Sequence, residues 1–421
     1  MMKLMRQTRV KDWFEYYRTP CVICGKTGGC MVNIDGSAVA CIRVESETFF
    51  SKNSALPSYL HFLKGDKRKK IDQDEIEILN EGYPKQKNHV LNGVFRSLLD
   101  CLQLEDDHYK HLVSQERQLT DDQVSVRQYS SFPDKPWEIA RMLQEGLEID
   151  HFKGIPGFYL KDEKYWTIAG TKGILIPFRN HYNEIVGFQY RIDNPPNIVE
   201  VKTNGPGLKA RVLEQPNKVQ VAFQGEIISE QFVNLGKQWT TIYHDGDIKG
   251  WIRVVKGNRY FWLSSANKPH GTGSGNPAPI HVAVPTKKLQ NWKEGELLKT
   301  RTAWLSEGPL KCDIAADCIE KLYDPLEIED IGDTFLALPG VGAWRLAIPV
   351  LKEMGVEQVN LCFDADAVSN PHVKKHLMEC AKELKLQGFK GNLILWNEDE
   401  GKGIDDFLLA GDKIPHMKKM F

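Results

Sequence analysis

The sequence lacks several features that mark common functional classes. No run of eighteen or more apolar residues occurs in the 421-residue chain, so we expect no segment to span a membrane. The formal net charge is only −1, which excludes a polycation that binds nucleic acid along its whole length. Any nucleic-acid surface must therefore be a local basic groove. A Walker A pattern is also absent, so a helicase motor is excluded.

Cysteine is scarce outside one short stretch. The first ten residues carry charge but no apolar core of a secretory signal, so we expect a cytoplasmic protein with reduced thiols. Cysteines in such a protein serve as metal ligands or as core residues more often than as disulfides. The five cysteines outside residues 21–41 lie mostly in apolar segments, and we expect them to be small buried hydrophobes.

The cysteines within residues 21–41 predict a zinc site. Cys21-Val-Ile-Cys24-Gly is typical of a zinc knuckle, in which a tight turn directs two thiolates at one tetrahedral ion. An Asp-Gly pair farther along predicts a hairpin that places Cys30 and Cys41 opposite each other. The four sulfurs would then converge, and zinc would hold together a segment too small to fold alone.

The fourth ligand of this site is left open by the sequence. His61 is an alternative to Cys30, because imidazole is an equally good zinc ligand. The other interpretation is a group of buried free cysteines, which the close spacing of four thiols disfavours.

Composition shifts divide the chain into segments of an α+β multidomain protein. They are a cysteine-containing region, a polar linker, a helical and then β-rich region, and an α/β region, at residues 1–63, 64–90, 91–300 and 301–421. In the third segment, apolar residues recur at helical spacing from Leu91 to about Glu145. Strand patterns follow, including a hairpin across the turn at residues 181–183 and a long strand over residues 251–262.

From residue 302 onward, short apolar strands alternate with helical segments, which predicts a parallel sheet covered by helices. Acidic residues follow three of the predicted strands: Glu307, Asp364, Asp366, Asp405 and Asp406. Parallel strands would bring these acids to one edge of the sheet, where carboxylates repel one another unless cations lie between them. Mg²⁺ or Mn²⁺ held in this way suits phosphoryl transfer. Singly, each motif is better explained as a solvated loop or helix cap, but all three in order favour a metal site.

The order Glu307-Gly308, then Asp364-Ala-Asp366, then a further acidic loop resembles the Toprim domain. That domain is shared by bacterial-type primases, topoisomerases, small RNA maturases and certain nucleases. The segment Leu338-Pro-Gly-Val-Gly342 also resembles the Toprim pattern. The resemblance covers about residues 302–410 and implies a C-terminal α/β domain with a parallel sheet.

The upstream segments resemble those of the bacterial replicative primase family. The segment from His111 to Tyr129 is similar to the family's short helical segment, and residues 173–191 are similar to the first hairpin of its core. The chain is closest to the divergent primase-like proteins of phages, plasmids and other mobile elements. It departs from the family at Val44, where a second Cys-x-x-Cys would have its cysteine, and by an insertion at about residues 195–300.

This resemblance implies a DNA primase-like nucleotidyltransferase that acts in replication of a mobile element. Such an enzyme makes short primers on single-stranded DNA from nucleoside triphosphates, with structural zinc and two catalytic Mg²⁺ or Mn²⁺ ions, and works with a separate helicase or polymerase. Glu307, Asp364 and Asp366 are the implied metal ligands, and Asp405 and Asp406 complete the catalytic set. Basic residues implied to hold the template or the triphosphate are Arg179, Arg191, Arg259, Lys268 and Lys311.

Two other functions use the same features. A Toprim nuclease would apply the same acids to water instead of a 3′-hydroxyl, although such nucleases usually carry an ATPase domain or are much shorter. A non-catalytic module that binds single-stranded nucleic acid is the alternative outside the enzymes. The joint presence of Glu307, Asp364, Asp366 and Asp405 disfavours that module.

Overall fold

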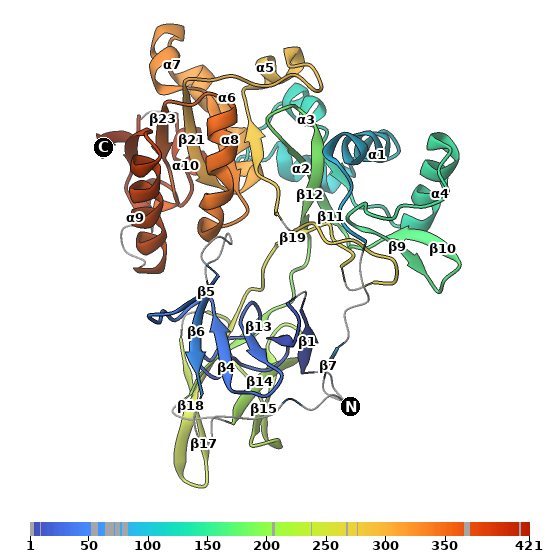
Figure 1. Cartoon of the computed structure of the whole chain (residues 1–421), viewed down its shortest axis with the longest axis vertical. Coiled ribbons are helices and arrows are strands. Elements are labelled where there is room, and N and C mark those ends of the chain that lie inside the picture. The colour runs from blue at the N-terminus through green and yellow to red at the C-terminus, as the bar shows by residue number, and fades with distance from the viewer. Residues whose placement is uncertain are drawn as a thin grey trace.

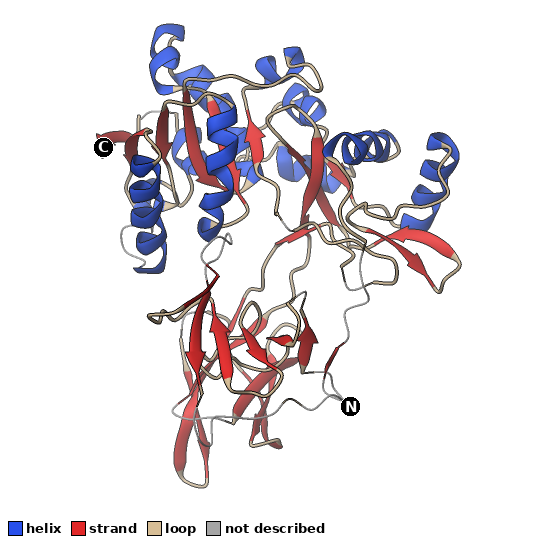
Figure 2. Ribbon diagram, viewed as in Figure 1, coloured by secondary structure: helices blue, strands red, loops and turns tan. Residues whose placement is uncertain are grey.

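The computed structural model describes residues 4–8, 10–51, 58–63, 71, 76–77, 83–203, 207–236, 238–266, 268–275, 277–365, 371–411 and 414–421. Figure 1 shows an upper part, built from residues 88–192 and from the C-terminal region, and a lower part, built from the N-terminal region and residues 198–255. Figure 2 shows that the drawn helices lie in the upper part, whereas the lower part consists of strands and loops. None of the helices in the described ranges is long and apolar enough to cross a lipid bilayer.

The N-terminal region forms one sheet with the strand order β5-β6-β4-β3-β2-β1-β7. Its strands are β1 (Met5–Gln7), β2 (Trp13–Tyr16), β3 (Met31–Asn33), β4 (Ala38–Cys41), β5 (Phe49–Ser51), β6 (Ser58–Phe62) and β7 (Ile76–Glu77). The β3–β4 hairpin turns at Gly36, whose φ of +70° suits glycine, at the Asp-Gly pair that predicted it. β7 pairs with β1, so this sheet extends into the segment predicted to be a linker.

The middle region surrounds a sheet with the order β19-β12-β11-β8. Its elements are α1 (Asn88–Asp100), α2 (Asp106–Leu112), α3 (Asp121–Arg127), β8 (Ser130–Ser131), α4 (Pro136–Leu147), β9 (Phe158–Lys161), β10 (Tyr165–Ile168), β11 (Gly173–Arg179), β12 (Ile185–Ile192) and β19 (Tyr260–Trp262). The apolar stripe predicted on α1 is buried at Val94, Leu98 and Leu99. β11 and β12 pair as an antiparallel hairpin, as the sequence predicts.

Six strands between β12 and β19 form a separate β-module. They are β13 (Ile198–Thr203), β14 (Leu208–Glu214), β15 (Lys218–Phe223), β16 (Glu226–Phe232), β17 (Thr240–His244) and β18 (Asp247–Val255). The strands form two three-stranded sheets, β13-β18-β17 and β14-β15-β16, and both sheets contribute to one apolar core. This module accounts for part of the insertion predicted at residues 195–300.

The prediction of a single strand over residues 251–262 is wrong. The segment contains two strands, β18 and β19, which belong to different sheets. Between them the chain leaves the β-module beside the segment by which it entered. A Cβ atom at Gly257 would lie only 2.1 Å from the backbone oxygen of Pro196, so the close approach of the two chain segments requires glycine.

The C-terminal region is an α/β unit around a sheet with the order β20-β22-β21-β23-β24-β25. Its elements are β20 (His281–Ala283), α5 (Thr286–Asn291), β21 (Thr302–Glu307), α6 (Pro309–Leu322), α7 (Pro325–Ile331), β22 (Thr334–Leu338), η3 (Val341–Leu346), α8 (Ala347–Glu353), β23 (Gln358–Leu361), α9 (Pro371–Leu386), β24 (Lys390–Leu395), η5 (Glu398–Glu400), α10 (Ile404–Leu409) and β25 (His416–Lys419). The four central strands are parallel, and the edge strands β20 and β25 are antiparallel. Because β20 precedes residue 301, this sheet begins before the boundary predicted there.

A buried ionic network fixes α3 against α6. The Arg127 guanidinium donates to Asp313 Oδ1 at 2.6 Å and to Asp317 Oδ2 at 2.8 Å, and all three side chains are buried. Tyr129 also donates to Asp313, at 2.7 Å. Removing one partner would leave a buried charge uncompensated, so the network ties the middle region firmly to the C-terminal unit.

Candidate active site and metal centre

Two predicted acids lie at the same edge of the C-terminal sheet. Glu307 is the last residue of β21, and Asp364 follows the end of β23. These strands are parallel neighbours, with Leu305 paired to Leu361. The residues that follow each strand therefore lie at the same edge of the sheet. Gly308, with φ of +81°, turns the chain sharply from Glu307 into α6.

Lys311, in the first turn of α6, contacts Asp364. Its Nζ donates to Oδ1 at 2.7 Å and to Oδ2 at 2.9 Å. Burial alone would lower the pKa of Lys311, but the Asp364 carboxylate raises it, with smaller contributions from Asp405 and Glu307. Lys311 therefore remains a cation and supplies positive charge at the acidic edge.

Asp405 is a fully buried carboxylate in the first turn of α10. Its Oδ2 accepts from Arg117 Nη1 at 2.7 Å, whereas its Oδ1 has no hydrogen-bond partner in the described part of the chain. Burial, and then the neighbouring Asp406, raise the pKa of Asp405. A Cβ atom on Gly403 would lie 2.3 Å from this Oδ1 and 3.1 Å from Lys311 Nζ, so Asp405 and Lys311 converge on the same glycine.

The remaining two acids of the predicted set are Asp406, which is not buried as Asp405 is, and Asp366. Asp406 is exposed, and its Oδ2 accepts from the backbone N–H of Gly403 at 3.2 Å, as a helix cap does. Asp366 lies outside the described residues. Among the described residues, no three carboxylates lie as close together as the four sulfurs of the cysteine cluster. Carboxylate oxygens are the ligands that Mg²⁺ and Mn²⁺ prefer, and the unpaired Oδ1 of Asp405 fits such an ion.

A cluster of basic side chains lies beside the acids. Arg117 links it to Asp405, and Arg191 on β12 is paired across the sheet with Tyr260 on β19. Burial, and then the charges of Arg191, Arg117 and Arg259, lower the pKa of His111 to about 4. Within the described residues its Nε2 has no hydrogen-bond partner. Arg117, Arg191 and Arg259 repel one another around the neutral His111 imidazole, and a bound anion would offset this repulsion.

Two of the predicted basic residues do not join this cluster. Arg179 is buried, with 4 % of its surface exposed, and its guanidinium donates to Gln128 Oε1 at 2.8 Å and to Asn183 Oδ1 at 3.3 Å. A guanidinium enclosed in this way supports the hairpin and does not face a template, which corrects the prediction for Arg179. Lys268 is exposed, and its Nζ lies 5.7 Å from the centre of the Tyr159 ring.

The cysteine cluster forms a candidate metal centre. The Sγ atoms of Cys21, Cys24, Cys30 and Cys41 all lie within 4.8 Å of one another. His61 takes no part, because its Nε2 lies 3.0 Å from the backbone oxygen of Val44. Four thiolates at this spacing fit a tetrahedral zinc site, so the cluster could bind zinc with Cys30 as the fourth ligand.

Neighbouring donors support the cysteine cluster. The backbone N–H groups of Arg43 and Val44 donate to Cys41 Sγ at 3.4 and 3.3 Å. The Arg43 guanidinium donates to Cys30 Sγ at 3.4 Å and to the backbone oxygen of Gly28 at 3.0 Å. Burial raises the pKa of Cys41 to about 11, so a thiolate there requires a compensating cation.

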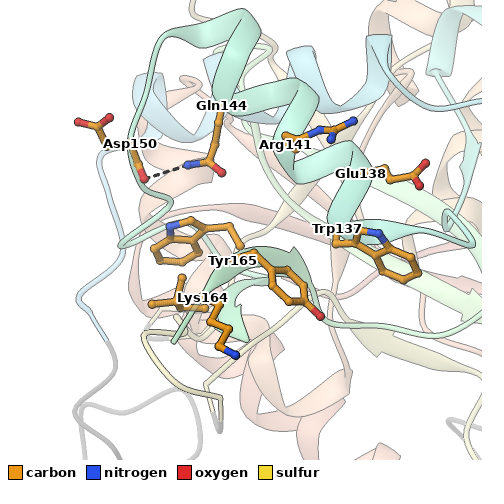
Figure 3. Close-up of a pocket in the computed structure, with 9 residues that line it drawn as sticks. Trp137, Glu138, Arg141, Gln144, Asp150, Lys164 and Tyr165 are labelled. Atoms are coloured by element: carbon orange, nitrogen blue, oxygen red, sulfur yellow. Dashed lines mark hydrogen bonds between the residues drawn. The ribbon is translucent and has the colours of Figure 1, made fainter. Parts of the chain in front are cut away.

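A separate pocket of about 500 Å³ lies between α4 and the β9–β10 hairpin (Figure 3). Trp137 and Tyr165 contribute aromatic surface to it and are 44 % and 40 % exposed. Its charged lining residues are two acids and two bases: Glu138, Asp150, Arg141 and Lys164. This balance provides no net charge for a phosphate, and α4, β9 and β10 lie away from β21 and β23 in Figure 1.

Sequence reasoning missed Arg117 and His111 as members of the site. Both lie in the segment that resembles the short helical segment of the primase family, but that resemblance assigns no role to either side chain. Thr120, in the same segment, caps α3 by accepting from the backbone N–H of Gln123 at 3.3 Å. The contact of Arg117 with Asp405 joins residues 288 positions apart, which no local pattern encodes.

Comparison with known proteins gives three findings. A family model described as "Domain of unknown function (DUF3854)" matches residues 332–414. No curated protein matches the chain. Among solved structures, the chain is similar to the zinc-binding and RNA polymerase domains of the Aquifex aeolicus primase, with 11 % identity, a TM-score of 0.43, and coverage of 97 % of this chain and 80 % of that chain.

Further similar structures are also primase domains. The RNA polymerase domain of the Mycobacterium tuberculosis primase DnaG has 10 % identity and a TM-score of 0.41, over 77 % of this chain and 82 % of that chain. A DnaG primase catalytic domain bound to single-stranded DNA has 9 % identity and a TM-score of 0.41, over 77 % of this chain and 75 % of that chain.

Proposed function

We propose that this protein is a primase-like nucleotidyltransferase that synthesises short primers on single-stranded DNA, with a Toprim-type catalytic site in its C-terminal unit. The observation that carries the proposal is Asp405, a fully buried carboxylate with one oxygen that has no partner among the described residues. Burying an unpaired carboxylate oxygen costs free energy, so its presence indicates a partner that binds there during function. Its neighbours Asp364 and Lys311 supply further charge at the same edge.

The basic cluster of Arg117, Arg191 and Arg259 is the proposed site for the triphosphate and the template backbone. Arg117 pairs with Asp405, so a phosphate bound by the cluster would lie next to the acidic edge. Tyr260, which is 40 % exposed and adjacent to Arg191 across the sheet, offers a ring on which a base can stack. Lys311 is placed to shift from Asp364 to a phosphate oxygen as the substrate arrives.

Glu307, Asp364 and Asp405 are the residues that would hold divalent ions, together with Asp366, which lies outside the described residues. When bound, Mg²⁺ or Mn²⁺ would neutralise the triphosphate and favour ionisation of the attacking 3′-hydroxyl. In the proposed reaction the 3′-oxygen forms a bond to the α-phosphorus of the incoming nucleotide, and pyrophosphate leaves. Gly403 has no side chain, which lets the side chains of Asp405 and Lys311 lie directly against its backbone.

Finer parts of the proposal depend on the resemblance of the sequence motifs. They are the use of nucleoside triphosphates, a separate helicase or polymerase as partner, and a role in replication of a mobile element. The cysteine cluster, loaded with zinc, is the proposed contact for single-stranded template.

The test is primer synthesis by the full chain on a single-stranded DNA template with labelled nucleotides and Mg²⁺ or Mn²⁺. The Asp364→Asn variant removes the negative charge with little change in shape, and we expect it to lose at least about a hundredfold in primer yield. Asp330→Asn is the matched control, because Asp330 is exposed and lies at the opposite end of β21. It should synthesise primers at the wild-type rate.

Other outcomes would replace the proposal. Degradation of the template that is lost in Asp364→Asn, without primer synthesis, would identify a nuclease that uses the same acids on water. Template binding without either activity, on a template supplied with both metals, would identify a non-catalytic binding module.

A further inference from the structure

The outer face of one sheet of the β-module is not assigned to the acidic site or to the metal centre. In the sheet β13-β18-β17, side chains alternate between the module core and the outside. Ile252 and Val254 of β18 and Ile242 of β17 are buried in the core. The residues between them must therefore point outward, because successive side chains in a strand lie on opposite faces.

The register of the sheet places aromatic residues together on this outer face. On β18 the outward residues include Trp251, which is paired with Thr241 of β17 and with Lys202 of β13. Tyr243 shares the face of Thr241 on β17. Trp239 directly precedes β17, and its ring contacts Arg253 of the same outer face. Trp239 is 37 % exposed and Tyr243 is 63 % exposed. We call the outer residues Trp239, Tyr243, Trp251, Lys202 and Arg253 the aromatic face.

Cationic side chains are interleaved with these rings. Lys202 Nζ lies 5.6 Å from the centre of the Trp251 ring, and the Arg253 guanidinium carbon lies 4.6 Å from the centre of the Trp239 ring. Glu200, an acid on the same side of β13, pairs with Arg253 at 2.5 Å, so these two charges compensate each other and Lys202 supplies the net positive charge of the face. The face continues into a pocket of about 500 Å³ that Arg253 and Lys256 help to line.

We propose that the aromatic face is a stacking platform for single-stranded nucleic acid, separate from the basic cluster beside the acids. Flat rings on a sheet stack bases without selecting their sequence, and interleaved cations contact the phosphates between them. The inference extends the proposed function by a second binding surface for the same class of ligand. It does not depend on catalysis at the acidic edge.

The chemistry of the face favours nucleic acid over a protein partner. A protein interface is built around a continuous apolar core with charged groups at its rim. Here cations lie directly against the rings, where a base and its phosphate would each find a partner. The edge strand β16 of the other sheet differs, since it exposes Phe232 and Ile227 at 75 % and 62 % among the acids Glu226 and Glu230.

The experiment measures the affinity of the full chain for a labelled oligothymidylate by fluorescence anisotropy, without nucleotides or added Mg²⁺. Trp239→Ala combined with Tyr243→Ala should weaken binding by about tenfold or more, the usual effect of removing stacking rings. Trp239→Phe should retain most of the affinity, since a phenyl ring also stacks. Lys202→Ala should reduce the slope of log affinity against log salt by about 0.7, as expected for one lost phosphate contact on a single strand.

Phe232→Ala is the matched control, because it removes an even more exposed aromatic ring from the other sheet of the same module. It should bind oligothymidylate as the wild type does, and thermal melting should be alike for all variants. Wild-type affinity in the Trp239→Ala, Tyr243→Ala double variant would overturn the platform, and so would an equal loss in Phe232→Ala. The Asp364→Asn variant should bind oligothymidylate normally while losing primer synthesis, which separates this inference from the proposed function.

Discussion

Lys311 Nζ lies 2.7 and 2.9 Å from the two carboxylate oxygens of Asp364, so the chain holds its own cation against the acid that follows β23. Lys311 stands in the first turn of α6, directly after the sharp turn at Gly308. A divalent ion that uses both oxygens of Asp364 must therefore displace this ammonium group. Lys311 and a divalent metal ion would therefore compete for the carboxylate of Asp364.

Replacing Lys311 with methionine should strengthen metal binding and weaken catalysis. Without the competing ammonium group, we expect the affinity for Mn²⁺ to rise by about threefold to tenfold, since an unpaired carboxylate binds a cation more readily. Primer synthesis should fall, because Lys311 no longer contacts a phosphate. Calorimetric titration with Mn²⁺ measures the first effect. Lys402→Met, which replaces an exposed lysine in the nearby loop, is the control and should bind Mn²⁺ as the wild type does. If Lys311→Met and Lys402→Met bind Mn²⁺ with the same affinity, Lys311 does not compete with the metal ion.

The cysteine cluster predicts a clear difference between two variants. Cys30→Ser should lose zinc, because the Cys30 sulfur is one of the four that converge. The substitution should remove about a quarter of the zinc-binding free energy, which is ~10–16 kcal/mol for structural sites. His61→Ala should keep one zinc ion per chain, because the His61 ring faces the backbone oxygen of Val44. Zinc content measured by mass spectrometry after dialysis against a weak chelator distinguishes the variants. Loss of zinc from His61→Ala would restore histidine as the fourth ligand.

His111 should report the binding of an anion to the basic cluster. Its pKa of about 4 reflects burial and the nearby charges of Arg191 and Arg117. A bound triphosphate would offset those charges, so we expect the pKa of His111 to rise by about one unit or more on nucleotide addition. An NMR titration of the histidine ring signals measures it.

Arg191→Gln provides the control for this titration. It removes one of the repelling charges, so it should raise the pKa of His111 in the absence of nucleotide. Lys153→Gln should leave that pKa unchanged, because the Lys153 ammonium group lies over the Tyr83 ring and is not among the charges that act on His111. Nucleotide binding with no change at His111 would place the triphosphate elsewhere.

Much of the local structure could be predicted from the sequence because its signals are local. The turn at Gly36, the β11–β12 hairpin and the positions of strands β21 to β24 along the chain follow from turn chemistry and apolar periodicity. The edge where Glu307 and Asp364 meet also follows, because parallel neighbouring strands must end on the same side.

What the sequence could not provide were contacts between distant segments. Arg179 carries the same charge as Arg191 on the same hairpin, but the packing of α3 against β11 buries Arg179 and leaves Arg191 half-exposed. The separation of β18 from β19 depends on the route by which the chain leaves the β-module at Gly257. Asp405 is buried because Arg117, from a loop far away in the chain, covers one of its oxygens.

The buried network around Asp313 predicts how stability depends on pH. Burial alone would raise the pKa of Asp313, but Arg127 and His281 lower it to about 2 from its ordinary value of 3.8. Because the folded pKa lies below the unfolded one, this carboxylate contributes fully to the free energy of unfolding above about pH 4. The contribution, about 2 kcal/mol, is lost as the pH falls from about 4 toward 2.

Asp313→Asn tests this dependence. The variant should be less stable at neutral pH by about 3–5 kcal/mol, because it breaks a buried ion pair with Arg127. The free energy of unfolding of this variant should change less than that of the wild type as the pH falls from about 5 to 2, because the carboxylate with the lowered pKa has been removed. Urea unfolding followed by tryptophan fluorescence across a pH series gives both values. Asp330→Asn, an exposed acid in the same unit, corrects for zinc release and other acid effects. Equal pH slopes for Asp313→Asn and Asp330→Asn would show that Asp313 does not set the acid stability.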